Sequence, residues 1–515
     1  MIRQLHIEDL KAFARPREIQ LAPITLVFGE NSAGKSSLLQ ALLLLKQTLD
    51  SSEDGALWTA GELVDLGGYA NLVHRHDPSR SLKLGLTTSE ETASSATARA
   101  RHTTSFVFGA GDEGLARIRR VELGWAHEKH AVNLRAELRP DATTRAGRPA
   151  FAMPADDWPP RALVDWLQAV LGPRLHAPPV WQDCREAAVL ALARPTSERS
   201  VEAWNGIEPD EVGDALSFLS GRMRPGQPSE FAAGHWLPRY LDPPASITPV
   251  ADGSGVAAVA AAVDTILGQT TERLLTHLRG ITHLGPARDI PERVFPLRPH
   301  GMQRGHGRGR EAARLVVDPG LLASVNEHFR RLEVPYELDA VRLGGDDPLL
   351  ENSGALRLLD SRYPGNLQVN IADVGFGISQ LLPIVVAAVA STGGTVIMEQ
   401  PELHVHPRLQ ARLGDVLVEE APGTQFIVET HSEHLMLRLL SHVRAGSLDP
   451  THLSVLYVDH DEAGEGAGVH RLEVDEFGEF VQRWPRGFFT EREEELLDQG
   501  NGEAAAKPSA REVYR

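Results

Sequence analysis

Cysteine, long apolar runs and a signal peptide are all missing or nearly missing from this sequence. Cys184 is the single cysteine among 515 residues, which excludes an intramolecular disulfide and any thiolate cluster for zinc or an iron–sulfur centre. The longest apolar stretches, 38–45 and 378–390, are too short to cross a membrane. The N-terminus lacks the apolar core and small-residue cleavage site of a signal peptide. We therefore expect a cytoplasmic protein without membrane contact.

The chain is also poor in aromatic residues and in positive charge. Aromatic residues make up 6%, hydrophobic residues 42% and charged residues 24%, which is typical of a globular protein with room for several domains. The formal net charge of −18 makes the surface as a whole repel phosphate backbones. Any contact with nucleic acid would therefore need a local basic patch.

Apolar patterning predicts an α/β protein that is interrupted by a segment of different character. Residues 24–28 read as a buried strand, and helix formers from position 36 predict a helix soon after it. Short β-like runs between 62 and 140 predict an antiparallel sheet, whereas the proline-rich stretch 150–280 shows short helical patterns without a heptad repeat. Strands and helices alternate again beyond position 320. We expect four regions: an α/β and antiparallel part over 1–145, a mainly helical insert over 146–280, a second α/β part over 281–490 and a disordered acidic tail over 491–515.

The clearest motif is a glycine-rich loop between the buried strand and the helix. Residues 29–36, GENSAGKS, satisfy the phosphate-loop pattern G-x-x-x-x-G-K-[ST]. Glycines let successive backbone N–H groups point at phosphate oxygens, and the helix N-terminus adds positive potential. Lys35 is expected to reach the β- and γ-phosphates, and the Ser36 hydroxyl is expected to bind magnesium. The predicted nucleotide contacts are Gly29, Asn31, Ser32, Ala33, Gly34, Lys35, Ser36 and Ser37.

A nucleotide hydrolase also needs a carboxylate at the end of an apolar strand to hold magnesium. The stretch 395–399 ends in Glu399, which we predict to be this carboxylate. Gln400 follows where a glutamate would ordinarily activate water, and an amide orients water without accepting its proton. We therefore expect slow hydrolysis, and we expect Gln400→Glu to raise turnover. The alternative is that another carboxylate, Glu402 or Glu429, serves as the base.

Further segments carry a family resemblance. After 29–36 come 373–380 (DVGFGISQ), 399–407 (EQPELHVHP), 429–434 (ETHSEH) and 484–489 (WPRGFF). The set resembles the ABC-type ATPase heads of the SMC, RecF and OLD proteins, and especially a bacterial group of predicted AAA ATPases from phage-defence and mobile loci. The ending WPRGFF resembles the C-terminal signature of that last group.

The resemblance implies an α/β fold of the P-loop ABC/SMC type. The ATPase head would be split into two half-heads, with an antiparallel β lobe and an inserted, mainly helical module. Gln47 would sense magnesium and the γ-phosphate, and His431 would contact that phosphate in the same chain. Ser379 would contact a γ-phosphate bound to a second protomer. The implied catalytic set is Lys35, Glu399, Gln400, His431 and Ser379, and the implied magnesium ligands are Ser36, Gln47 and Glu399.

The resemblance also implies ATP and Mg²⁺ as cofactors and a homodimer or higher oligomer as the working form. The expected function is a slow switch ATPase that acts as the sensor of a bacterial anti-phage defence system. It would control a separate effector, such as a nuclease or a toxin, and DNA is a further candidate partner. Two alternatives stay open: a RecF/SMC-like ATPase of DNA repair or DNA organisation, and a hydrolysis-deficient scaffold locked by ATP.

Two clusters of acidic or histidine residues could indicate a zinc site or a nuclease. A zinc site could draw on Glu402 and the histidines His404, His406, His431 and His434. Their spacing does not match a helical zinc motif, so we expect no catalytic zinc. Asp459 and Asp461 follow an apolar strand as a carboxylate pair. Too little chain follows for a nuclease domain, so we expect an acidic turn there.

Three basic or aromatic features have two interpretations each. Arg288 either stabilises γ-phosphate charge or forms a surface ion pair. The glycine- and arginine-rich stretch 300–310 either grips nucleic acid or is a solubilising loop. Phe13 either stacks on adenine or packs in the core.

Overall fold

The computed structural model describes residues 1–49, 56–89, 101–111, 114–127, 130–143, 149–152, 273–288, 292–297, 310–344, 352–363, 365, 367–460, 466–482 and 484. Most of the helical insert expected over 146–280, most of the arginine-rich stretch, Asp461 and the C-terminal tail lie outside the described residues; within the expected insert, 149–152 form a strand. No helix in the described part of the chain is long and apolar enough to span a bilayer.

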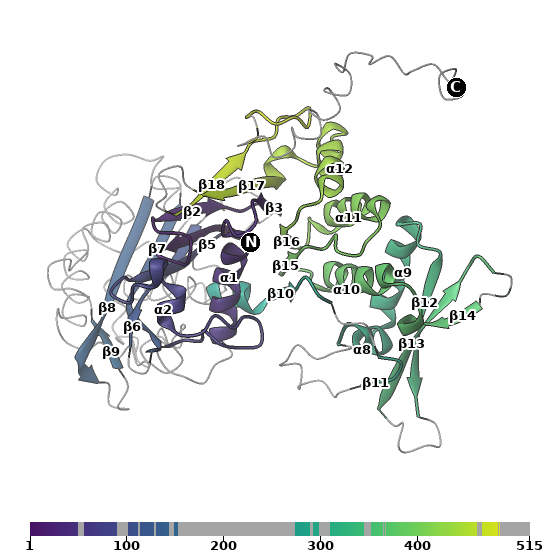
Figure 1. Cartoon of the computed structure of the whole chain (residues 1–515), viewed down its shortest axis with the longest axis horizontal. Coiled ribbons are helices and arrows are strands. Elements are labelled where there is room, and N and C mark those ends of the chain that lie inside the picture. The colour runs from purple at the N-terminus through teal and green to yellow at the C-terminus, as the bar shows by residue number, and fades with distance from the viewer. Residues whose placement is uncertain are drawn as a thin grey trace, which may run out of the picture.

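A six-stranded central sheet is built from both ends of the chain (Figure 1). The five strands from β10 to β17 are parallel, and only β18 pairs in the antiparallel sense. The sheet order is β10 (Ile281–Leu284), β15 (Thr395–Glu399), β16 (Gln425–Glu429), β3 (Ile24–Gly29), β17 (Leu453–His460) and β18 (Ala467–Leu472). Because β3 lies between β16 and β17, the N-terminal part completes the sheet of the C-terminal part.

Alternating side chains of the central strands feed two separate cores, one on each face. Leu26 and Phe28 belong to the core that α10 (Phe376–Ala390), α11 (Pro407–Glu420) and α12 (Glu433–Arg444) cover. Val27 belongs to the core on the opposite face, which α1 (Lys35–Leu49) covers. Figure 1 shows these helices on opposite sides of the sheet. This period-two alternation buries both faces of the sheet.

An antiparallel sheet of eight strands packs on the other side of α1. Leu82, Leu84 and Leu86 point from it into the same core as α1, which explains why that helix is apolar on almost every side. Its strands are β1 (Ile2–Glu8), β2 (Arg17–Gln20), β4 (Ala56–Leu57), β5 (Leu82–Ser89), β6 (Arg101–Ala110), β7 (Ala116–His127), β8 (His130–Thr143) and β9 (Pro149–Ala152), with the short helix α2 (Tyr69–Leu72) nearby. The predicted antiparallel lobe is therefore confirmed.

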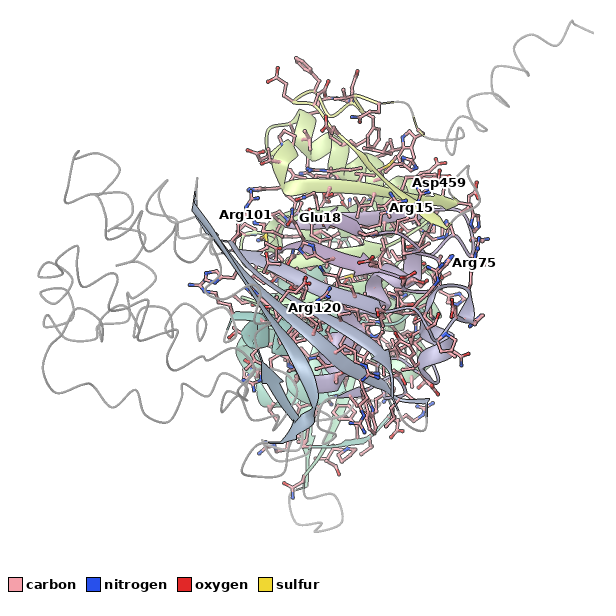
Figure 2. The ribbon with its side chains drawn as sticks, turned by 90° about the vertical axis from the view of Figure 1, so that its left-hand side faces the viewer. Arg15, Glu18, Arg75, Arg101, Arg120 and Asp459 are labelled. Carbon is pink, nitrogen blue, oxygen red and sulfur yellow. The ribbon has the colours of Figure 1, made fainter. Side chains whose placement is uncertain are left out.

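The outer side of this sheet carries charged residues, as the view in Figure 2 shows around Glu18, Arg101 and Arg120. Glu122 pairs there with Lys83 at 2.6 Å and with Arg120 at 2.8 Å. Ion pairs of this kind suit a solvated face and add little stability.

A third, four-stranded antiparallel sheet extends from the helical side of the molecule (Figure 1). It comprises β11 (Phe295–Pro296), β12 (Tyr336–Leu343), β13 (Ser353–Asp360) and β14 (Leu367–Asn370), and α8 (Arg310–Val317) and α9 (Pro319–Arg331) accompany it. The strands and helices that the sequence predicts to alternate beyond position 320 are therefore confirmed. The predicted fold class, an α/β P-loop head assembled from two parts of the chain with an antiparallel lobe, is also confirmed.

Candidate functional site

The phosphate loop joins β3 to α1, as the sequence predicts. Gly29 and Gly34 have φ angles of +144° and +114°, which strain any other residue. A Cβ on Gly29 would also lie 2.0 Å from the Val458 carbonyl oxygen. The side chains of Asn31 and Ser32 are exposed in the loop, whereas Ala33 and Ser37 are buried beneath it, each among the predicted nucleotide contacts.

Lys35 folds back over the loop that precedes it. Its Nζ donates hydrogen bonds to the carbonyl oxygens of Gly29 at 3.0 Å and Glu30 at 2.7 Å. Burial lowers the pKa of Lys35, and attraction to Glu429 and Glu30 opposes that shift. The ammonium group therefore lies at the centre of the loop, where the motif predicts it.

Two carboxylates end neighbouring strands beside this loop. Glu399 and Glu429 face each other in the register of β15 and β16. The Ser36 hydroxyl donates to Glu429 Oε1 at 3.0 Å, while Glu429 Oε2 is buried without a hydrogen-bond partner among the described residues. Burial raises the pKa of Glu429; the bond from Ser36 opposes this, and repulsion from Glu399 adds to it.

This donor set fits a magnesium ion. Magnesium prefers hard oxygen ligands. The Ser36 hydroxyl is bonded to Glu429 Oε1, and Glu429 Oε2 has no partner among the described residues. Glu399 is held from the far side, because its Oε1 lies 2.9 Å from His283 Nε2 on β10. Sequence reasoning missed His283, since only the pairing of β10 with β15 brings it there.

The contacts of the turn after Glu399 distinguish Glu402 from Glu429, the two alternative bases. Gln400 has a φ of +45° and its N–H donates to the Glu429 carbonyl oxygen at 2.7 Å. Both oxygens of Glu402 are occupied: one accepts from Thr430 Oγ1 and the other from the His431 N–H, each at 2.7 Å. Glu402 therefore holds the segment after β16, and Glu429 keeps an available oxygen.

His431 lies near both Glu402 and Lys35 of the phosphate loop. Burial lowers its pKa, the positive charge of Lys35 lowers it further, and Glu402 acts in the opposite direction. A neutral imidazole near Lys35 can donate to or accept from a phosphate oxygen. Its predicted contact with the γ-phosphate stays a prediction that this placement supports.

The predicted role of Gln47 in binding magnesium stays a prediction, and the contacts of Gln47 in this structure point to another role. Gln47 lies eleven residues beyond Ser36 on the continuous helix α1, which carries it about 16 Å along the axis. Its amide is also used elsewhere: Nε2 donates to the carbonyls of Trp58 at 2.6 Å and Val64 at 3.1 Å, and Oε1 accepts from the Val64 N–H at 3.0 Å. Gln47 therefore holds the segment after α1 in place.

Ser379 lies near the start of α10 and is 1% exposed. Its hydroxyl is therefore not presented at the surface of this single chain. A contact with a phosphate on a second protomer would require the start of α10 to open, so that role stays a prediction.

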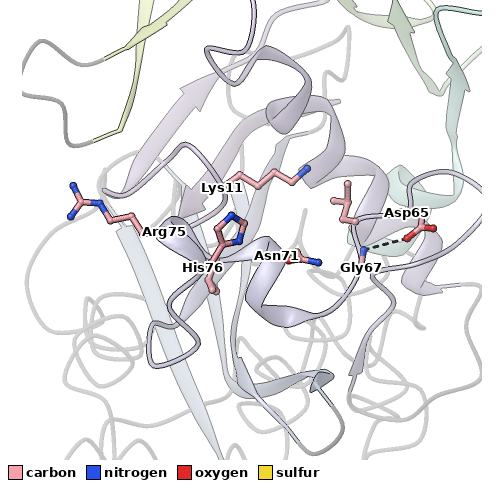
Figure 3. Close-up of a pocket in the computed structure, with 8 residues that line it drawn as sticks. Lys11, Asp65, Gly67, Asn71, Arg75 and His76 are labelled. Carbon is pink, nitrogen blue, oxygen red and sulfur yellow. Dashed lines mark hydrogen bonds between the residues drawn. The ribbon is translucent and has the colours of Figure 1, made fainter.

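A pocket of about 500 Å³ lies between Lys11 and the segment 65–76 (Figure 3). The segment that carries Lys11 packs against the phosphate loop, because a Cβ on Gly34 would lie 3.2 Å from the side chain of Ala12. Lys11 donates to Gln40 Oε1 at 2.8 Å, and burial lowers its pKa. The lining residues are Lys11, Asp65, Leu66, Gly67, Asn71, Val73, Arg75 and His76. Phe13 is instead fully buried in the core.

Backbone strain gathers around this pocket and is invisible to motif analysis. Lys11, Arg75 and His76 all have positive φ angles, of 48°, 58° and 56°. Such angles cost non-glycine residues free energy, and they cluster at functional sites. The pocket is therefore a candidate ligand site, although no sequence pattern indicated it.

The other polar candidates have structural roles. Within the described part of the chain, no group of three metal-binding side chains comes together. His406 caps α11 by accepting from the Arg408 N–H at 3.2 Å. Asp459 Oδ1 accepts a hydrogen bond from His470 Nε2 at 3.0 Å, across the β17–β18 pair.

Comparison with known proteins agrees with this geometry. A family model described as "AAA domain" matches residues 4–56, which contain the phosphate loop. A second, described as "AAA domain, putative AbiEii toxin, Type IV TA system", matches residues 328–437, which contain Glu399 and His431. These matches and the phosphate-loop geometry support a nucleotide-binding ATPase. Among curated proteins, none matches the sequence.

Solved structures with similar chain traces include three SMC head domains. The head from Thermotoga maritima is 11% identical with a TM-score of 0.36, and the alignment covers 92% of this chain and 99% of that one. A head with a coiled coil and joint from Pyrococcus yayanosii is 9% identical with a TM-score of 0.36, over 97% and 99%. A head with an extended coiled coil from Pyrococcus furiosus, bound to the C-terminal domain of ScpA, is 11% identical with a TM-score of 0.34, over 97% and 98%.

Proposed function

We propose that this chain binds ATP with Mg²⁺ at the phosphate loop and hydrolyses it slowly. The observation that carries the proposal is the hydrogen bond from Ser36 to Glu429, which leaves Glu429 Oε2 buried and unpaired beside Glu399. Ser36 and Glu399 would hold the ion, which neutralises charge on the phosphate oxygens when bound. Lys35 would exchange its two loop carbonyls for phosphate oxygens.

The remaining residues divide the handling of water between them. Gln400 orients the attacking water but accepts no proton, and Glu429 supplies the proton acceptor from the neighbouring strand. His431 would contact the γ-phosphate, held in place by Glu402. Splitting orientation and proton transfer between two strands is our reason for expecting slow turnover.

The pocket that Lys11 and Asn71 line would take the nucleoside end of ATP. The segment that carries Lys11 packs against the phosphate loop, and the pocket combines apolar walls with an amide and cationic groups. Ligand pockets are commonly apolar cavities with a few placed polar groups.

The biological role that we propose is a switch in bacterial anti-phage defence. The chain would work in the cytoplasm as an ATP-dependent dimer or higher oligomer, and it would control a separate nuclease or toxin. The motif resemblance supports this role, as does the toxin–antitoxin description of the matching family model. DNA stays a candidate partner, and the RecF/SMC-like role is the first alternative. Gln400 favours the second alternative, a scaffold that ATP locks together.

The test is steady-state ATP hydrolysis over a range of protein concentrations, with Lys35→Ala as the control. Turnover that rises more than linearly with protein concentration and disappears in the control is expected for an oligomer-coupled ATPase. Nucleotide binding without turnover would instead favour the scaffold. Absence of both would refute the proposed function.

A further inference from the structure

Arg288 occupies a place that neither sequence interpretation anticipates. It follows β10 and is 8% exposed, so it is not a surface ion-pairing residue. Its recorded contacts go to Gln380 on α10 and to two carbonyl oxygens of the turn at 400–404. One guanidinium nitrogen, Nη1, is buried with no partner among the described residues.

The contact with Gln380 is reciprocal and fixes the start of α10. Gln380 Oε1 accepts from the Arg288 backbone N–H at 3.3 Å and from its Nε at 3.2 Å. Gln380 Nε2 donates to the Arg288 carbonyl oxygen at 2.7 Å. Both residues are buried, so breaking this pair would leave polar groups without partners.

The other end of the guanidinium reaches the turn that follows Glu399. Arg288 Nη2 donates to the carbonyl oxygens of Pro401 at 3.4 Å and Leu403 at 3.5 Å. The turn begins and ends with strained residues, because Gln400 and His404 have φ angles of +45° and +62°. Strained backbone persists only where its surroundings hold it, and Arg288 supplies two of the bonds that do so.

The turn leads directly into the phosphate site. Glu402, inside the turn, attracts Arg288 and binds the backbone N–H of His431. Gln400 binds the carbonyl of Glu429 through its own N–H. A displacement of the turn would therefore shift His431 and Glu429 relative to Lys35.

We propose that Arg288 is a positioning residue that ties the start of α10 to the 400–404 turn, so that the two segments move as one body. It acts on the reaction through Glu402 and Gln400 rather than by touching the nucleotide. The role of the turn in catalysis rests on the proposed ATPase function, whereas the mechanical tie does not.

The tie is tested by amide hydrogen exchange on the full chain without nucleotide. Arg288→Gln and Gln380→Met each remove one side of the contact, and both are expected to weaken protection in 376–380 and in 400–404 together. Arg288→Lys keeps the charge but lacks the planar fork, so it is expected to behave in the same way. It also serves if the glutamine variant does not fold. Arg438→Gln is the matched control, because Arg438 joins α11 to α12 through Asp415 at the surface.

Kinetics then test the consequence for the reaction. In the Arg288 variants kcat is expected to fall about 10- to 100-fold, while the Kd for a fluorescent ATP analogue stays within about twofold of the parent. Loss of protection in only one of the two segments would overturn the tie, whether or not the parent chain hydrolyses ATP. If ATP binding weakens, kcat falls and the melting temperature drops together, Arg288 has only a structural role. An inactive parent with paired loss of protection would reject the ATPase and keep the tie.

Discussion

The hydroxyl of Ser36 donates a 3.0 Å hydrogen bond to Glu429, a residue 393 positions away in the chain. The contact exists because β16 pairs with β3, so the end of one strand lies beside the start of α1. It combines a predicted magnesium ligand with a carboxylate whose second oxygen is unpaired. The predictions for catalysis follow from this pair.

Glu429→Gln is expected to lower kcat for ATP by about 100-fold or more, because the amide cannot accept a proton. Binding of ATP should persist, since Lys35 and the loop are unchanged. Hydrolysis by quenched-flow assay and binding by fluorescence titration check this. Glu473→Gln, at an exposed position, is the charge-matched control. Full turnover in Glu429→Gln would exclude Glu429 as the base.

Gln400→Glu is expected to raise turnover, because it places a proton acceptor where the amide only orients water. Introduced together with Glu429→Gln, it should restore part of the lost activity, since a carboxylate has moved from one strand end to the next. Steady-state phosphate release from the single and double variants measures this. No gain in either background would show that position 400 does not limit the rate.

Asn71→Ala is expected to weaken ATP binding about tenfold, which is the loss of roughly 1.4 kcal/mol of polar contact to the nucleoside. Binding of inorganic tripolyphosphate should not change, because the phosphate loop is intact. Isothermal titration of both ligands separates the two parts of the site. Asp77→Asn, just outside the lining set, is the control. Equal weakening for both ligands would argue against a nucleoside pocket.

Gln47→Leu is expected to destabilise the fold by about 1–3 kcal/mol, because it leaves buried backbone groups of Trp58 and Val64 without partners. Its effect on magnesium-dependent nucleotide binding should be negligible. Chemical denaturation and a magnesium titration of ATP binding measure the two effects. A large loss of magnesium dependence would instead support the predicted role of Gln47 at the ion.

Acid sensitivity is expected from two histidines that lie near Arg273, the buried His102 and the half-buried His277. Burial, reinforced by the charge of Arg273, lowers the pKa of His102 to about 3, and burial lowers that of His277 to about 4. Below the ordinary value of 6.5 only the unfolded chain takes up these protons readily. The stability that the neutral rings contribute is therefore complete above pH 6.5 and lost as pH falls below it, by up to about 1.4 kcal/mol per pH unit for each ring.

Thermal unfolding between pH 7.5 and 5 tests this expectation in the parent and in His102→Gln. The variant should show a shallower fall in melting temperature, whatever its stability at neutral pH. His452→Gln, which changes an exposed histidine, should keep the parent slope. Identical slopes in parent and His102→Gln would contradict the prediction.

Local motifs predicted those features whose chemistry is carried by neighbouring residues. The loop at 29–36 must follow a strand and precede a helix to bind phosphate, so its placement was readable from the chain alone. The strand ending at Glu399 was readable for the same reason. The order of motifs did not reveal the contacts of Gln47 with Trp58 and Val64, because these depend on how the segment after α1 folds back on that helix.

Local motifs could not predict contacts between residues that are distant in the sequence. Arg288 was expected at a phosphate or at the surface, but packing buries it between α10 and the 400–404 turn. The pocket beside Lys11 depends on two loops that approach one another and on strained φ angles that no residue type announces.

By itself, the sequence determined the phosphate loop, the strand that carries Glu399 and the alternation of apolar residues that makes an α/β core. Each of these depends on residues within one turn or one strand. Only the tertiary structure decided which carboxylate meets Ser36, where Gln47 points and what Arg288 holds. Those outcomes depend on the order of strands in the central sheet, and that order is set by burying both faces at once, a property of the whole chain.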